Sequence, residues 1–216
     1  MARHFRNGHW LALCALALAQ PVTARSVSGS VTTPAGTPIA GAVVFLQAPS
    51  PSATGQHATA VVDQVEKTFV PGLLPIVVGT SVRFPNHDQI QHHVYSFSAT
   101  KTFELPLYKG EEAPPVLFDK VGVVKIGCNI HDWMSGIILV LPTRHFAVTD
   151  SSGRYVLEDM PEGPSTLVVW HPLSNSKPEN TARQVLIGED LANQNFTLTL
   201  SPARSRAAVH GSRPAP

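Results

Sequence analysis

Short apolar segments, separated by turn-forming residues, run through most of this chain. Glycine, proline, asparagine and aspartate stand between them, and these residues favour turns over continued strands. No strong amphipathic helical period is found after the first 24 residues. Between residues 58 and 141 the strand-like segments are TAVVDQVEKTFV, LPIVVGTSVRF, HHVYSFS, VLFDKVGVVKIGC and GIILVLP. Their length and spacing are typical of antiparallel sandwiches and barrels, so we predict an all-β protein.

Further strand-like segments lie on either side of this central region. Residues 26–48 contain two short strands, Ser26–Thr32 and Gly41–Gln47, and residues 144–200 form a second β region. The stretch PSPSATGQ after the first pair is typical of a linker. Two strands alone are marginally stable in water. Either the two flanks form one smaller sandwich into which a central domain, residues 56–141, is inserted, or all strands form a single extended β unit.

The first 24 residues are typical of a secretory signal peptide. Arg3 and Arg6 precede the apolar stretch LALCALALA, and Val22 and Ala24 form a cleavage pattern of small residues. We therefore expect export to the periplasm and a mature chain that starts near Arg25. The apolar stretch is too short to span a bilayer, and no later segment is long and apolar enough. Residues 201–216 have little to bury, and we expect a disordered tail.

The charge of the chain excludes one class of partner. The 16 Lys and Arg residues nearly balance the 15 Asp and Glu residues, and the formal net charge is +1. No run of basic residues is present that could neutralise several phosphates. Nucleic acid is therefore not an expected partner.

Only Cys128 remains once the signal peptide, which contains Cys14, has been removed. In an oxidising compartment cysteines usually form disulfides, and this thiol has no partner in its own chain. A buried cysteine can act as a small apolar residue. The alternatives are a metal ligand, a nucleophile or a bridge between chains.

Cys128 opens the short stretch CNIHDWM, in which His131 and Met134 follow at intervals of three residues. Thiolate, imidazole and thioether are soft to borderline donors, and two histidines, a cysteine and a weak axial methionine form blue-copper sites. The second histidine has to come from elsewhere in the chain. The stretch FPNHDQIQHHVYSF offers three candidates, which are His87, His92 and His93.

The central region resembles the cupredoxins, in the stretch from FVPGLLPIVVGTSVRF through FPNHDQIQHHVYSF to CNIHDWM. In that family a Gly-Thr turn, a strand with V-x-F and an asparagine, and a ligand histidine before Asn-Val precede a C-x-x-H-x-x-M loop. The loop has the same length as in amicyanin. The resemblance implies a Greek-key sandwich and one type 1 copper ion, held by His92, Cys128, His131 and Met134.

His93 departs from this pattern, because cupredoxins have an asparagine after the ligand histidine. His93 is therefore a rival ligand. Strand alternation places it on one face with Tyr95 and Phe97, which we expect in the core, and places His92 on the face of Val94 and Ser96. Motif and alternation disagree here, and we favour His92 because a residue at the entry of a strand need not follow the pleat.

The two flanks resemble a second family. The stretches VSGSV, PIAGAVVFL, AVTDSSGRYVLEDMPEG and VVWHP are similar to parts of a carboxypeptidase regulatory-like, or transthyretin-like, sandwich. The layout of the whole chain also resembles exported proteins labelled as methylamine utilization proteins.

These resemblances imply a carrier of single electrons rather than an enzyme, with a redox partner in the cell envelope. By resemblance His131 is the exit for electrons, and Trp133 and Asp132 lie at the docking surface. An alternative is copper storage or delivery without electron relay, for which His87 and His93 offer transfer positions. A cysteine hydrolase that uses Cys128 is disfavoured, since a cysteine and a histidine on one short loop are poorly placed as nucleophile and base.

Overall fold

The computed structural model describes residues 25–47, 58–176 and 178–202. The expected signal peptide, the PSPSATGQ linker and all but the first two residues of the expected tail lie outside the described residues. Within the described ranges the only helical element is the 3-10 helix η2 (Pro178–Thr181). None of these residues belongs to a helix with the length and apolar character needed to cross a membrane. The prediction of an all-β fold is confirmed.

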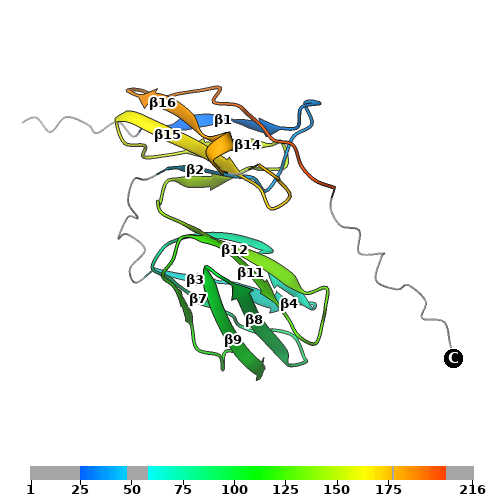
Figure 1. The fold of residues 1–216 in the computed structure, drawn as a ribbon. Coiled ribbons are helices and arrows are strands. Elements are labelled where there is room, and N and C mark those ends of the chain that lie inside the picture. Colours follow the sequence, from blue (N-terminus) through cyan, green and yellow to red (C-terminus); the bar gives the residue numbers. More distant parts are fainter. Residues whose placement is uncertain (1–24, 48–57, 177, 203–216) are drawn as a thin grey trace, which may run out of the picture.

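Ten strands form the central region (Figure 1). They are β3 (Thr59–Val61), β4 (Asp63–Val65), β5 (Thr68–Val70), β6 (Leu73–Val77), β7 (Thr80–Arg83), β8 (His92–Ser98), β9 (Lys101–Tyr108), β10 (Val116–Phe118), β11 (Gly122–Gly127) and β12 (Ser135–Leu141). One sheet has the order β6-β12-β11-β8-β9, a second has the order β10-β7-β3, and β4 and β5 form a hairpin. A core of buried apolar side chains fills this central sandwich.

We predicted an antiparallel arrangement, but two strand pairs of the central sandwich are parallel. They are β6 with β12 and β3 with β7. The chain changes sheet in the turn after β6. Gly79 has a φ of 89°, which glycine adopts at little cost, and its N–H donates to the carbonyl of Phe118. The chain therefore leaves one sheet after β6 and enters the other as β7.

Strands from before and after the central region pair with one another. They are β1 (Val27–Thr32), β2 (Val43–Leu46), β13 (Phe146–Val148), β14 (Arg154–Leu157), β15 (Gly163–Trp170), β16 (Arg183–Ile187) and β17 (Phe196–Thr197). The sheet orders are β14-β1-β17 and β13-β2-β15-β16, and an apolar core lies between the two sheets. We call this unit the flanking sandwich; it lies above the central sandwich in Figure 1.

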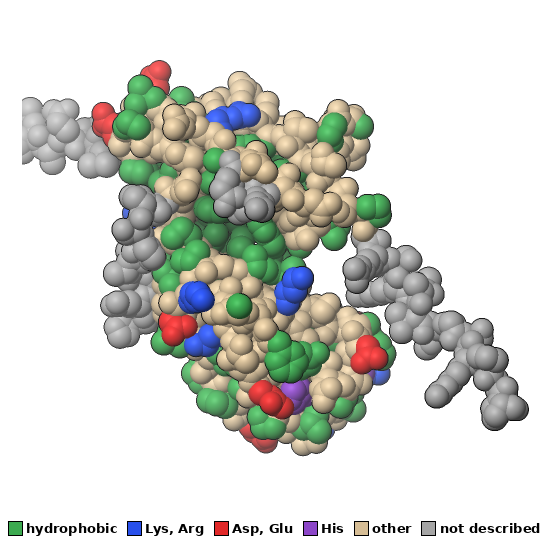
Figure 2. Space-filling model, viewed as in Figure 1, with side chains coloured by type: hydrophobic (Ala, Val, Ile, Leu, Met, Phe, Trp, Pro, Cys, Tyr) green, Lys and Arg blue, Asp and Glu red, His purple; other side chains and the backbone are tan. Residues whose placement is uncertain are grey.

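A third apolar cluster joins the two sandwiches. Along β12, Ile138 and Val140 face the central core, whereas Leu139 and Leu141 belong to a cluster with residues of β2 and β15. The same alternation on β11 places Val123 toward the flanking sandwich. Figure 2 shows hydrophobic side chains between the upper and lower parts of the molecule. The β12–β11 part of the larger sheet is therefore covered on both faces, and its edge with β8 and β9 extends away from this contact.

Candidate metal centre

Three predicted ligands lie together at one end of the central sandwich. His92 starts β8, Cys128 directly follows β11, and His131 lies in the loop before β12. The Sγ atom of Cys128 is 3.8 Å from Nδ1 of His92 and 3.8 Å from Nδ1 of His131. The three ligand atoms lie within 4.8 Å of one another. We call this group the His-Cys-His group.

The dimensions of the group fit a metal ion. A point placed about 2.2 Å from both atoms of a 3.8 Å pair subtends a trigonal angle of about 120°, and about 2.0–2.3 Å is the range for imidazole and thiolate ligands. Two nitrogens and one sulfur are donors for soft or borderline ions. Cys128 and His92 are buried and His131 is partly buried. The group can therefore hold a metal ion out of contact with most of the solvent.

The loop from Cys128 to Met134 is closed by its own backbone. The N–H of Cys128 donates to the carbonyl of Met134 at 3.1 Å, and the N–H of Met134 donates to the carbonyl of His131 at 2.9 Å. The flanking residues Gly127 and Ser135 form the last pair of the β11–β12 ladder. Cys128 and Met134 are both buried in the central core. The predicted axial ligand thus lies at the base of the same loop as the thiol.

Gly127 allows an aromatic ring to lie against the strand next to the thiol. Gly127 pairs with Tyr95 of β8, and a Cβ atom at this position would lie 3.1 Å from the Tyr95 ring. Any larger residue would have to displace the ring. The pairing of β11 with β8 brings Cys128 close to His92, which is distant in the sequence.

The rival ligand His93 lies outside the group. The β8–β9 register shifts between His92, which pairs with Tyr108, and Val94, which pairs with Leu105. The extra residue of this irregularity lies in β9, so β8 keeps its alternation and His93 faces away from His92 and Val94. Its Nε2 lies 2.8 Å from Oε1 of Glu104. Its Nδ1 is buried without a hydrogen-bond partner among the described residues.

The faces of β8 explain why alternation favoured the histidine that lies outside the group. Val94 and Ser96 face the core, whereas Phe97 is 81% exposed. We expected Phe97 in the core, and this prediction is wrong. The rings of His93, Tyr95 and Phe97 follow one another along the outer face.

His87 also lies outside the group. Its Nδ1 is 2.7 Å from Oδ1 of Asp63, and this hydrogen bond, together with the charge of Asp63, raises the pKa of the exposed His87. His87 and His93 are thus each bound to a carboxylate. Neither is placed to add a ligand to the His-Cys-His group.

Sequence reasoning missed Asp88, which contacts one of the ligands. Its Oδ2 lies 2.7 Å from Nε2 of His92. Burial raises the pKa of Asp88, but hydrogen bonds from His92 and from the backbone of Lys67 and Glu66 oppose it, and the pKa lies below its usual value. Asp88 is therefore ionised at neutral pH. The only signal in the sequence is an acidic residue four positions before a candidate ligand.

His131 is suited to bind a metal as the neutral imidazole. Desolvation lowers its pKa, and the neighbouring His92 and Lys67 lower it further, against an opposing contribution from Asp88. Only a neutral imidazole can offer a nitrogen lone pair to a metal. The ring of His131 lies 5.0 Å from the ring of His92 and 5.2 Å from the ring of Trp133.

The surface beside His131 is partly apolar. Trp133 is 54% exposed, and Ile130 is also exposed. Asp132, the other residue of the predicted docking surface, is exposed between His131 and Trp133. One edge of the metal group is therefore near the surface, next to a large aromatic side chain.

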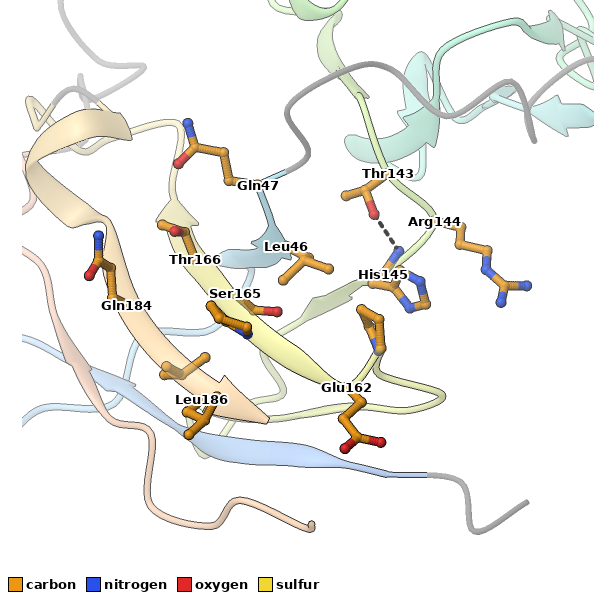
Figure 3. Close-up of a pocket in the computed structure, with 13 residues that line it drawn as sticks. Leu46, Gln47, Thr143, Arg144, His145, Glu162, Ser165, Thr166, Gln184 and Leu186 are labelled. Carbon is orange, nitrogen blue, oxygen red and sulfur yellow. Dashed lines mark hydrogen bonds between the residues drawn. The ribbon is translucent and has the colours of Figure 1, made fainter. Parts of the chain in front are cut away.

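Two of the larger hollows lined by described residues bear on the site. An open groove of about 1000 Å³ lies in the flanking sandwich and includes Arg144, His145, Glu162 and Gln184 (Figure 3). It contains no residue of the His-Cys-His group. A smaller hollow of about 540 Å³ is lined by Cys128, Met134 and Asp132 together with residues of β8 and β11, so it borders the metal group.

Two imidazoles and one thiol within reach of one ion define a candidate soft-metal centre in a β-sandwich. Comparison with solved structures finds similarity to cupredoxins. A purple cupredoxin from Nitrosopumilus maritimus is 26% identical, with 38% of this chain and 98% of that chain covered and a TM-score of 0.34. A reduced amicyanin variant is 24% identical, with 45% and 97% covered and a TM-score of 0.36.

A copper-containing nitrite reductase from Thermus scotoductus SA-01 is 29% identical, with a TM-score of 0.37. The match covers 42% of this chain and only 25% of the reductase chain. No protein-family model matches the sequence. No match to a curated protein is found either.

Proposed function

We propose that this chain is an exported mononuclear blue copper protein that carries single electrons between redox partners. The observation that supports this most is the buried convergence of His92 Nδ1, Cys128 Sγ and His131 Nδ1. In this proposal His92, Cys128 and His131 would hold the ion and Met134 would be a weaker fourth donor, which is the donor set of type 1 copper. Copper bound there supplies a one-electron couple.

The chain's part in this function is to hold the ligands in place. Cys128 is fixed by the backbone bond to Met134, and His92 is fixed by Asp88. The Cys128 side chain binds as the thiolate, since a metal keeps a coordinating thiol deprotonated. Ligands that are positioned in advance need little rearrangement when the charge of the site changes.

Export to the periplasm and a redox partner in the cell envelope are part of the proposal. They are supported by the N-terminal pattern of residues 1–24 and by the resemblance to cupredoxins. A carboxypeptidase regulatory-like character of the flanking sandwich and a link to methylamine utilization are supported by the sequence resemblances described above.

Copper storage or delivery without electron relay has less support. Delivery needs accessory ligands that can receive the ion, and the two candidates are His87 and His93. Both bind carboxylates instead, at 2.7 Å from Asp63 and 2.8 Å from Glu104. A hydrolase is disfavoured further because Cys128 is only 3% exposed.

A Cu(II) titration tests the proposed ligands. We expect the wild-type protein to bind one equivalent and to develop an intense thiolate-to-copper absorption band with a narrow copper hyperfine splitting. The His92→Ala variant should lose this band, because an equatorial ligand is missing. The His93→Ala variant is the matched control and should keep it. A band that survives in His92→Ala and disappears in His93→Ala would reverse the assignment, and a colourless wild-type protein that binds only Cu(I) would favour delivery.

Replacement of Trp133 by alanine tests the docking surface. Tryptophan is often a dominant contact residue in interfaces, so we expect the electron self-exchange rate between oxidised and reduced copies to fall by about tenfold, which corresponds to about 1.4 kcal/mol. The absorption band should stay the same because Trp133 is not a ligand. The rate constant is measured by NMR line broadening in mixtures of the two redox states.

Val156→Ala is the matched control for this variant. Val156 has the same exposed fraction of 54% as Trp133 but lies on β14 of the flanking sandwich. It should leave the self-exchange rate unchanged. Equal rates in Trp133→Ala and the wild-type protein would remove the docking role of Trp133.

A further inference from the structure

The carboxylate of Asp88 connects three parts of the chain at one point. Its Oδ2 lies 2.7 Å from Nε2 of His92. The backbone N–H groups of Glu66 and Lys67 donate to its two oxygens at 2.6 and 2.8 Å, and its own N–H donates to the side-chain oxygen of Asn86 at 3.0 Å. Asp88 therefore ties His92 to the turn of the β4–β5 hairpin and to the loop before β8.

The hairpin turn and Asn86 are each held in place by their own local structure. Glu66 and Lys67 form the two-residue turn of the hairpin with φ values of 51° and 58°, as expected for a type I′ turn, in which both central residues have positive φ. Asn86 is buried, and its side-chain N–H group donates to the carbonyls of Ile90 and Tyr108. The position of the Asp88 carboxylate is thus set by groups other than His92.

The hydrogen bond to Asp88 also fixes the protonation of the His92 ring. An ionised carboxylate only accepts hydrogen bonds, so Nε2 of His92 must carry the proton. In a neutral imidazole the other nitrogen, Nδ1, then has a free lone pair. Nδ1 is the atom that faces Cys128 Sγ at 3.8 Å. Asp88 thus holds His92 in the tautomer that a ligand at this position needs.

We propose that Asp88 is a positioning residue of the metal centre, which selects the tautomer of His92 and lowers the reduction potential of bound copper. This inference rests on the proposed copper function. A carboxylate that accepts from a ligand imidazole makes that imidazole a stronger donor. Its negative charge also interacts more favourably with Cu(II) than with Cu(I). His92 is fully buried, and the side chain of Asp88 is 14% exposed.

The next residue provides a natural comparison. His93 Nε2 lies 2.8 Å from Oε1 of Glu104, so a carboxylate is bonded to the same atom of the adjacent histidine. That histidine is not part of the His-Cys-His group. Glu104→Gln removes the charge from the same kind of hydrogen bond at a histidine that is not in the group.

The experiment compares Asp88→Asn with Glu104→Gln in the full chain, by titration with Cu(II) and Cu(I) and by measurement of the reduction potential. We expect Asp88→Asn to lower the affinity for Cu(II) by about 10- to 100-fold, which is the usual cost of losing such a partner, and the affinity for Cu(I) by less. Each tenfold difference between the two losses raises the potential by about 59 mV. Glu104→Gln should change neither affinity.

Two results would overturn the proposal. If Asp88→Asn lowers the affinities for Cu(II) and Cu(I) by the same factor, the potential stays constant and Asp88 only stabilises the hairpin. If Glu104→Gln raises the potential as much as Asp88→Asn does, the effect is a general one of surface charge. A rise in potential confined to Asp88→Asn supports the proposal, and a fall would contradict it.

A second measurement uses the metal-free wild-type protein and needs no variant to fold. The ¹⁵N shifts of the His92 ring should show a protonated Nε2 and an unprotonated Nδ1. A proton on Nδ1 would overturn the role of Asp88 even if copper binds as proposed. A wild-type protein with this tautomer and no thiolate-to-copper band would instead overturn the copper function and leave the Asp88–His92 link intact.

Discussion

Replacing Cys128 with alanine should remove the thiolate-to-copper absorption band completely and lower the affinity for Cu(II) by several orders of magnitude. Cys128 supplies the only sulfur of the His-Cys-His group, at 3.8 Å from both imidazole nitrogens. The other cysteine, Cys14, belongs to the expected signal peptide. A charge-transfer band of this kind needs a thiolate on the metal, and no other thiol is available to replace it.

The matched control is Met134→Leu, which conserves volume at the other end of the same loop. Such exchanges usually cost less than about 1.5 kcal/mol, so the fold should persist. Because the axial ligand of a blue-copper site is weak, the band should remain, with an altered potential. The two variants are compared by absorption and electron paramagnetic resonance after Cu(II) addition. A band that persists in Cys128→Ala would disprove the metal site.

The three residues of the metal group show what a sequence can reveal about a site. Cys128 and His131 lie on one short loop, so their proximity follows from the chain itself. His92 is 36 residues from Cys128, and its place depended on the resemblance to cupredoxins. Strand alternation alone favoured His93, since Phe97, which is 81% exposed, suggested the wrong core face.

Asp88 could not be predicted because its contacts depend on a turn that the sequence hides. Residues 59–70 were interpreted as a single strand-like segment, but the structure has three short strands there, with a turn at Glu66 and Lys67. Neither residue is a typical turn former with positive φ. A reader of the sequence who does not expect that turn has no reason to place the backbone N–H groups of Glu66 and Lys67 beside Asp88. The hydrogen bond between Asp88 and His92 is then not predicted either.

The apolar run GIILVLP contained more information about the fold than alternation would provide. A strand with one buried face alternates apolar and polar residues, whereas a strand covered on both faces has a continuous apolar run. In β12, Ile138 and Val140 face the central core, and Leu139 and Leu141 face the flanking sandwich. The run therefore marks the strand on which the two sandwiches meet.

Leu141→Ala should lower the free energy of unfolding by about 2–5 kcal/mol, which is the range for truncation of a buried leucine. Leu141 is 2% exposed and belongs to the cluster between the sandwiches, with Val43, Phe45, Leu139 and Val168. Because this cluster joins the two cores, we expect both sandwiches to unfold in a single transition. Urea denaturation of the full chain, followed by tryptophan fluorescence and circular dichroism, measures the loss.

Leu186→Ala is the matched control, since Leu186 is 70% exposed on β16, and surface substitutions usually change stability by less than about 0.5 kcal/mol. The copper band of Leu141→Ala should equal that of the wild-type protein under native conditions. Leu141 ends β12 and Met134 precedes its start, so about 20 Å of strand separates them. If the protein unfolds in two separate transitions and Leu141→Ala alters only one of them, the flanking sandwich does not stabilise the central sandwich. A single transition that shifts to a lower urea concentration would show that the two sandwiches stabilise each other.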